Sequence, residues 1–190
     1  MPDPKPMPRA PGQSGLKKRV EEMIRVDHAG EYGAVAIYRG QQAVFSRSPK
    51  TGRISRQIEE MAAQEQGHLD AFDKLIAERR VRPTAMAPLW EAAGFTLGAV
   101  TALMGEKAAH ACTEAVEDVI EKHYQHQIDE LDAADEEPEL KAAFTKFREE
   151  ELEHRDLAVE EGAKEAPGYA LLSHAIKTGC KLAIGITKKV

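Results

Sequence analysis

Two Glu-x-x-His motifs, each with a further Glu at the same distance upstream, constrain the fold of this chain more than any other feature. In both cases the upstream Glu stands thirty-four residues before the Glu of the motif. The two sets are Glu31 with Glu65 and His68, and Glu117 with Glu151 and His154. Four carboxylates and two imidazoles in this order form the ligand set of a two-iron centre in a four-helix bundle. The pattern therefore predicts an all-α, ferritin-like four-helix bundle around a buried pair of metal ions.

The spacing within and between the motifs suits helices. One Glu three residues before a His carries little weight, because chance supplies about one such pair in a chain this acidic. The matched upstream Glu residues give the pattern its force. Residues i and i+3 share a helix face, so the Glu and His of each motif converge on one metal. Thirty-four residues accommodate one helix, a turn and an antiparallel return. The two halves therefore resemble a degenerate repeat of a helical hairpin.

Composition agrees with one helical domain. The chain has 190 residues, enough for a single domain with a sizeable core. Charged residues make up 31% and aromatic residues 5%, a balance that favours helices over a β-sandwich. The net charge of −6 argues against general nucleic-acid binding. The two cysteines form no Cys-x-x-Cys pair, so we expect a reducing, intracellular compartment.

The N-terminal stretch is rich in proline, with Pro at positions 2, 4, 6, 8 and 11. This composition predicts a disordered or extended leader over residues 1–15, followed by one ferritin-like domain over residues 16–190. The leader lacks the apolar core of a signal peptide.

The chain also has no Gly-x-Gly-x-x-Gly motif and no P-loop. Electrons for a redox reaction must therefore come from the substrate, a directly bound donor or a partner.

Apolar residues at helical spacing predict four bundle helices, at about 16–46, 53–78, 106–134 and 138–163. Gly30 and Gly33 lie inside the first of these, on either side of Glu31. Each costs a helix up to about 1 kcal/mol relative to Ala. Close helix packing and room beside a metal or substrate both account for them, and the sequence leaves both interpretations open.

Two further segments are expected outside the four-helix bundle. An apolar stretch begins at Leu89 and ends at Met104. It is either a buried core helix or a helix on a membrane surface, with Trp90, Phe95 and Leu97 on its interfacial face. It is too short to favour a transmembrane span. The segment after Pro167 has the pattern of a basic amphipathic helix, which either packs on the bundle or contacts an anionic membrane.

The other histidines have several interpretations. His28 lies one turn from Glu31, where a supporting role for a ligand and a role in polar packing are both open. His123 could orient a ligand through a hydrogen bond, and Tyr124 beside it belongs to the apolar side of its helix. The remaining three are expected at the surface: His110, His126 and His174.

The ligand types indicate the metal. Carboxylates with one imidazole per metal suit iron or manganese, and the lack of Cys ligands argues against structural zinc or an iron–sulfur cluster. Two metal ions close together need bridging carboxylates, and Glu65 and Glu151 are the natural bridges. The upstream Glu31 and Glu117 would be terminal ligands, one per metal. A pair of Fe2+ ions can bind dioxygen and reduce it, so the pattern indicates oxygen chemistry.

Several segments of the chain resemble the demethoxyubiquinone hydroxylases, the membrane-bound two-iron monooxygenases of ubiquinone biosynthesis. IRVDHAGEYGA, around Glu31, is similar to the first ligand segment of that family. QEQGHL, ACTEAVE and FREEELEH are similar to its other three ligand segments, and VRPT and PLW to its connection into the apolar helix. The resemblance extends from about Leu16 to the C-terminus, and the chain keeps all six ligand positions.

The resemblance implies an enzyme that uses dioxygen to hydroxylate the ring of a polyprenylated methoxy-benzoquinol. It also implies a reduced electron donor such as NADH, and peripheral attachment to a membrane through the Leu89 to Met104 stretch and the C-terminal helix. It favours the membrane interpretation of both segments. The expected location is the cytoplasmic side of the bacterial inner membrane, with an accessory lipid-binding or ubiquinone-biosynthesis protein as a further partner.

Two alternatives remain open beside the enzyme. A soluble ferritin relative that stores iron or scavenges peroxide would share the ligands, but it would have little use for the apolar stretch. A helical bundle without enzymatic activity, whose acidic residues only keep it in solution, is the third hypothesis.

Overall fold

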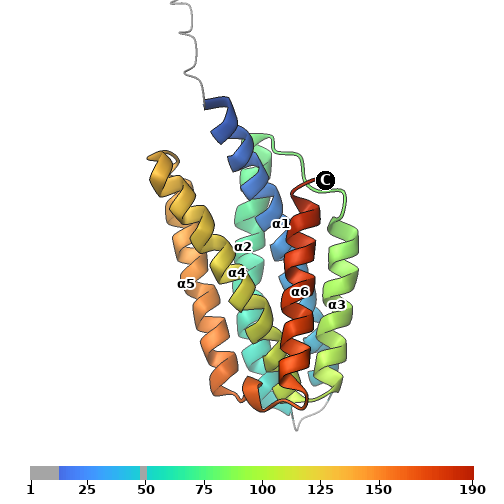
Figure 1. The fold of residues 1–190 in the computed structure, drawn as a ribbon. Coiled ribbons are helices and arrows are strands. Elements are labelled where there is room, and N and C mark those ends of the chain that lie inside the picture. Colours follow the sequence, from blue (N-terminus) through green and yellow to red (C-terminus); the bar gives the residue numbers. More distant parts are fainter. Residues whose placement is uncertain (1–12, 48–50) are drawn as a thin grey trace, which may run out of the picture.

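The computed structural model describes residues 13–47 and 51–190, and over these ranges the chain is all-α (Figure 1), which confirms the predicted fold class. The elements are α1 (Gln13–Phe45), α2 (Gly52–Arg79), α3 (Ala87–Leu103), α4 (Glu106–Ala134), α5 (Pro138–Glu160), the short 3-10 helix η2 (Ala163–Glu165) and α6 (Tyr169–Thr187). Helix α1 starts three residues before the predicted boundary at Leu16. The rest of the predicted leader, residues 1–12, and part of the loop at Pro49 lie outside the described residues.

The internal repeat is longer than the predicted hairpin. Helix α1 packs on α2 and α3, and α4 packs in the same way on α5 and α6. A shift of eighty-six residues carries Glu31 to Glu117 and Glu65 to Glu151, and it also carries the start of α2 at Gly52 to the start of α5. The chain is therefore two copies of a three-helix unit, and the four long bundle helices are the first two helices of each copy.

Two apolar clusters fill the bundle on either side of the predicted ligands. One contains Phe72, Phe144 and Phe147, and the ring centroid of Phe147 lies 4.4 Å from that of His68. The other contains Tyr38, whose ring centroid lies 6.2 Å from that of His154. Burial of these large side chains stabilises the bundle and encloses the ligand residues in an apolar surrounding.

Helix α3 lies against α1 through glycine. A Cβ atom added to Gly98 would overlap the carbonyl oxygen of Ile37, and one added to Gly40 would overlap the carbonyl oxygen of Phe95. Gly94 likewise approaches the backbone of Gly33. The two helix backbones are therefore in direct contact, which only residues without a side chain permit. Gly33 takes part in this contact only through its carbonyl oxygen, because a Cβ at Gly33 itself would meet no atom within 4 Å.

The large apolar side chains of α3 point away from the bundle. The buried residues of α3 are all small: Gly94, Gly98, Thr101 and Ala102. Its exposed apolar side chains are Leu89, Phe95 and Val100, followed by Leu103 and Met104 at its end. The alternative of a fully buried core helix is therefore wrong. Leu97 is an exception among the large side chains, because it was expected on the interfacial face and instead packs against the cluster that contains Ile37 and Ile176. Within the described parts of the chain, no helix is both long and apolar enough to cross a bilayer.

Helix α6 divides its two faces between the bundle and the exterior. One face packs on α4, with Ile176 against Cys112 and Val116. Lys177 adds ion pairs to α4, at 3.1 Å from Glu114 Oε1 and 3.0 Å from Asp118 Oδ2. Packing on the bundle is thus confirmed for this face. The opposite face exposes 77% of Leu171 and 64% of Leu182, which packing does not explain.

Helices α3 and α6 form one continuous outer side of the molecule. They run side by side in Figure 1, and the Trp90 indole Nε1 donates a hydrogen bond of 3.0 Å to Thr187 Oγ1 across them. The exposed apolar side chains of both helices therefore belong to the same region of the surface, which we call the α3–α6 surface.

The glycine contact can be tested by Gly98→Ala. The added methyl group meets the Ile37 carbonyl, so we expect the free energy of unfolding to fall by about 1–3 kcal/mol, as in other overpacked interiors. Thermal unfolding measures the effect. Gly179→Ala on α6 is the matched control, because a Cβ there meets no atom within 4 Å. This control should be neutral or should stabilise the helix by up to about 1 kcal/mol.

Candidate metal centre

The structure brings together all six predicted ligand residues, which come from four different helices. They are Glu31 on α1, Glu65 and His68 on α2, Glu117 on α4, and Glu151 and His154 on α5, and all are buried. Their ligand atoms fall into two groups of four, and the atoms of each group lie within 4.8 Å of one another. One group joins Glu31 and His68, and the other joins Glu117 and His154. Glu65 and Glu151 belong to both groups, which is the arrangement that two bridging carboxylates require.

Within the part of the chain that the structure describes, five of the ligand atoms that face this cluster have no hydrogen-bond partner. Among the described residues, no hydrogen-bond partner exists for either oxygen of Glu65, for Glu151 Oε2, or for Nδ1 of His68 and His154. The two nitrogens nevertheless lie near carboxylate oxygens: His154 Nδ1 is 3.0 Å from Glu65 Oε1, and His68 Nδ1 is 3.3 Å from Glu151 Oε1. Buried polar atoms without partners cost free energy. Lone pairs that converge in this way fit a pair of cations.

The pKa values of the ligand residues also show that the cluster contains more negative charge than its buried surroundings favour. Burial, with repulsion from the neighbouring carboxylates, raises the pKa of Glu31 to about 8 despite the nearby His68. Burial and repulsion from Glu151 raise the pKa of Glu65 as well. Burial acts against the charged imidazole, but the surrounding carboxylates outweigh it and raise the pKa of His68 to about 11 and of His154 to about 9. Without metal, protons are therefore the cations that the cluster retains.

Each histidine of the centre is held by the other half of the chain. His68 Nε2 lies 2.8 Å from Glu150 Oε2, and His154 Nε2 lies 2.6 Å from Gln64 Oε1. Since these oxygens accept a hydrogen bond from Nε2–H, Nδ1 of each ring is free to face the cluster. Gln64 and Glu150 immediately precede the motif glutamates and are related by the same eighty-six-residue shift. Neither residue was predicted from the sequence, although their repeated position was a usable signal.

Two tyrosines hold the upstream glutamates in the same crossed manner. The Tyr124 hydroxyl donates to Glu31 Oε1 at 2.6 Å, and the Tyr38 hydroxyl donates to Glu117 Oε1 at 3.1 Å. Each tyrosine stands seven residues, or two helical turns, after the Glu of its own helix and bonds the Glu of the other. Both are buried. Tyr124 was expected on the apolar side of its helix, but its bond to Glu31 and the whole role of Tyr38 were missed.

The remaining histidines differ from the sequence-based expectations in two cases. His28 bonds Asp73 Oδ1 at 2.8 Å, which agrees with polar packing rather than ligand support. His123 Nε2 lies 3.3 Å from Asp27 Oδ1, so among the described residues it contacts Asp27 rather than a ligand of the centre. His126 and His174 are exposed as predicted. His110 is buried, so its predicted surface position is wrong.

The burial of His110 has a plain cause. Every residue of α4 from position 108 to position 117 is buried, because α3, α6 and η2 cover the faces that the bundle leaves open. Helical periodicity alone predicts one buried face and cannot reveal this cover. Burial lowers the pKa of His110 accordingly.

A narrow cavity of about 40 Å³ reaches the centre from between α1 and α4. Its lining includes three of the predicted ligands, Glu31, Glu117 and Glu151, and the small residue Gly30. A Cβ at Gly30 would meet no atom within 4 Å. The interpretation of room beside the centre therefore fits Gly30, which lines this cavity. The contact with α3 does not require glycine at position 33, because a Cβ there would also meet no atom within 4 Å.

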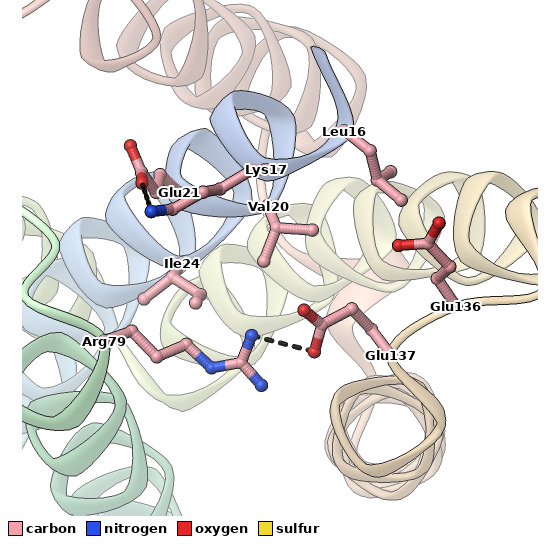
Figure 2. Close-up of a pocket in the computed structure, with 8 residues that line it drawn as sticks. All are labelled: Leu16, Lys17, Val20, Glu21, Ile24, Arg79, Glu136 and Glu137. Carbon is pink, nitrogen blue, oxygen red and sulfur yellow. Dashed lines mark ion pairs between the residues drawn. The ribbon is translucent and has the colours of Figure 1, made fainter. Parts of the chain in front are cut away.

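A wider cavity, of about 410 Å³, lies elsewhere, between the start of α1, the end of α2 and the loop before α5 (Figure 2). Arg79 and Glu137 line it and form an ion pair of 2.8 Å. None of the six predicted ligands contributes to its lining. Size alone therefore does not identify the reactive site in this molecule, and the narrow cavity is the one that adjoins the ligands.

Comparison with known proteins assigns the family. The family model described as "Ubiquinone biosynthesis protein COQ7" matches residues 18–187. The chain belongs to this family. The family match confirms the resemblance to the demethoxyubiquinone hydroxylases and covers both three-helix units.

Individual relatives carry names of one enzyme activity. The chain is 51% identical over 182 residues to the 3-demethoxyubiquinol 3-hydroxylase of Rhodospirillum rubrum, covering 96% of this chain and 84% of the relative. It is 49% identical over 177 residues to the mitochondrial NADPH-dependent 3-demethoxyubiquinone 3-hydroxylase of Dictyostelium discoideum, covering 92% and 80%. The human protein of the same name is 47% identical over 173 residues, covering 90% and 78%. These matches favour the enzyme hypothesis over iron storage and over a non-enzymatic bundle.

The pKa shifts predict how stability depends on pH without metal. Glu31, His68 and His154 have higher pKa values in the folded state than their ordinary values, so the folded chain binds more protons than the unfolded chain. Stability should therefore fall as the pH rises from about pH 5 to about pH 9, where Glu31 and His154 lose their protons, and His68 extends the loss to about pH 11. Thermal unfolding in chelator measures this trend.

Anaerobic Fe2+ should stabilise the protein most at the upper end of this range, because metal binding requires the deprotonated ligands. A melting temperature that rises with pH in the metal-free protein would contradict the account.

Proposed function

We propose that the centre binds two Fe2+ ions in the manner of the ferritin-like carboxylate proteins. One ion would be bound by Glu31 and His68 and the other by Glu117 and His154, with Glu65 and Glu151 bridging both. The observation that supports this most is the pair of overlapping four-residue groups, each with one imidazole and three carboxylates. Such oxygen-rich ligand sets suit iron or manganese.

The chain acts as a 3-demethoxyubiquinol 3-hydroxylase of ubiquinone biosynthesis, as its family and its close relatives indicate. The reaction replaces a ring hydrogen of the quinol by a hydroxyl group. One oxygen atom of dioxygen enters the ring, and the other leaves as water after the uptake of two electrons and two protons. When bound, the iron pair supplies the reducing chemistry that dioxygen needs.

The residues of the chain position the reactants and exclude water. Tyr38 donates a hydrogen bond to Glu117 and Tyr124 donates one to Glu31, the two proposed terminal ligands. The packed helices fix the distance between these two carboxylates. The cavity walls beside the ligands are apolar, with Ala34, Val116 and Ile120 among them. A dry surrounding strengthens the electrostatic interactions at the centre and protects reactive species from side reactions.

We propose that the α3–α6 surface rests on the membrane that dissolves the polyprenyl tail. Its exposed leucines and Phe95 provide apolar contact, and the exposed Lys181 and Lys189 of the C-terminal segment attract anionic headgroups. We further propose that the attachment is peripheral and on the cytoplasmic side of the bacterial inner membrane. The same surface would also receive an accessory lipid-binding protein of ubiquinone biosynthesis.

A reduced nicotinamide is the proposed electron donor. The sequence resemblance implied NADH, whereas the names of the Dictyostelium discoideum and human relatives specify NADPH. Anaerobic reduction of the iron-loaded protein by each nucleotide, followed optically, would identify the donor that this chain uses.

The ligand proposal predicts that Glu65→Ala and Glu151→Ala each abolish iron loading and quinol hydroxylation together, because each removes a carboxylate shared by both metal positions. Elemental analysis and quinone chromatography measure the two effects. Glu59→Ala is the matched control, since Glu59 is exposed on the same helix as Glu65. Hydroxylation that persists in an iron-free variant would overturn the proposal.

The membrane proposal predicts that Leu103→Glu combined with Leu171→Glu weakens binding to anionic lipid vesicles roughly tenfold or more, because two exposed apolar anchors become charged. Vesicle flotation measures binding. Ala142→Glu on α5 is the control, because it adds a charge at an exposed position outside the α3–α6 surface. Equal flotation of all three proteins would contradict the proposal.

A further inference from the structure

The two three-helix units differ at the narrow cavity. The eighty-six-residue shift pairs Asp27 with Thr113, and it pairs His123 with Ile37. It also pairs Ile184 of α6 with Gly98 of α3. Asp27, His123 and Ile184 all line the cavity. On the equivalent side of the other unit, Gly98 lies directly against the Ile37 backbone. The two units therefore carry different residues on the side of the centre where the cavity lies. One of these residues, Asp27, carries a carboxylate.

Asp27 is buried but incompletely bonded. It is 5% exposed, and its Oδ1 accepts a hydrogen bond of 3.0 Å from Gln127 Nε2. His123 Nε2 lies 3.3 Å from the same oxygen. Its second oxygen, Oδ2, has no hydrogen-bond partner among the residues that the structure describes. Burial raises the pKa of Asp27, and the contacts from His123 and Gln127 oppose that rise and favour the carboxylate.

An unpartnered buried carboxylate oxygen needs a donor. The cavity that Asp27 lines contains the predicted ligands Glu31, Glu117 and Glu151, and its other walls are largely apolar. A benzoquinol carries two hydroxyl donors on its ring, and one of them could meet the free Asp27 acceptor, which lies outside the predicted ligand set. A quinone carries carbonyl acceptors in the same places and would face Asp27 Oδ2 without a proton between the two oxygens.

We propose that Asp27 Oδ2 accepts a hydrogen bond from a ring hydroxyl of the substrate, so that Asp27 fixes the orientation of the ring beside the centre and selects the quinol over the quinone. The inference rests on the proposed function, because it assumes that the substrate is a quinol. Gln127 and His123 act as positioning residues, since both hold the opposite oxygen of Asp27. The cavity of about 40 Å³ is smaller than the roughly 150 Å³ that accommodates benzene, so the ring must displace side chains such as Ile184 when it enters.

Asp27→Asn tests the proposal, because it keeps the acceptor for Gln127 and exchanges the free acceptor for an N–H donor. We expect the affinity for a short-tailed demethoxyubiquinol to fall about tenfold, as for loss of a charge-assisted hydrogen bond. The affinity for the matching quinone should stay the same or rise. Anaerobic calorimetry on the iron-loaded protein measures both without turnover. Under oxygen, KM for the quinol should rise more than kcat falls.

Two further variants keep the test decisive. Asp129→Asn, at an exposed position of α4, should bind both forms of the ring like the wild type. Asp27→Thr installs the residue of the other unit, whose single hydroxyl would be engaged by Gln127, and it should also lose quinol affinity. It serves as the test if Asp27→Asn fails to fold.

The outcomes separate the inference from the proposed function. A wild-type protein that neither binds nor hydroxylates the quinol would overturn the proposed function. If the wild type does both, and folded Asp27 variants retain its quinol affinity and its preference between the two ring forms, the inference alone is wrong.

Discussion

Four carboxylates that face one another in an apolar interior are the constraint on which the rest of this structure depends. Burying one unpaired charge is already costly, and four together are tolerated only with compensating cations. The need for cations is clearest at Glu65 and Glu151. Among the described residues, neither oxygen of Glu65 has a hydrogen-bond partner, and Glu151 has one oxygen without a partner. The crossed tyrosines, the outer partners of the two histidines and the two aromatic clusters all serve to hold these groups in place. The bundle is thus organised around a buried site that can hold positive charge.

The sequence predicted which six residues meet in the interior because the signal for them is local. Glu and His three residues apart must share a helix face, and a matched upstream Glu fixes the partner helix. The fold class followed from the same pattern. The partners of the ligands were not predicted, because Gln64, Glu150 and Tyr38 act across the bundle, and contacts between helices leave no mark in the periodicity of one helix. His110 was misplaced for the same reason, since its burial depends on helices that cover α4 from outside.

The two outer helices show how similar units acquire different roles. Gly98 allows α3 to press its backbone against α1, which closes that side of the centre. At the equivalent place α6 carries Ile184, and a cavity lined by Asp27 and His123 lies beside it. A glycine in direct backbone contact on one side thus corresponds to an isoleucine that lines a cavity on the other. The hydropathy of α3 left burial and a membrane surface both open, and the glycine contact explains why most of its large side chains lie outside.

The crossed contacts between the halves also bear on how such a chain could have arisen. Each unit supplies a tyrosine and a motif-flanking side chain that bond ligands of the other unit, so neither half completes a metal position by itself. A shorter ancestor of one unit would have built the same centre as a symmetric dimer. Fusing two copies into one polypeptide frees each copy to mutate separately. An asymmetric feature such as Asp27 opposite Thr113 is then within reach, whereas a homodimer would have to carry either residue on both sides.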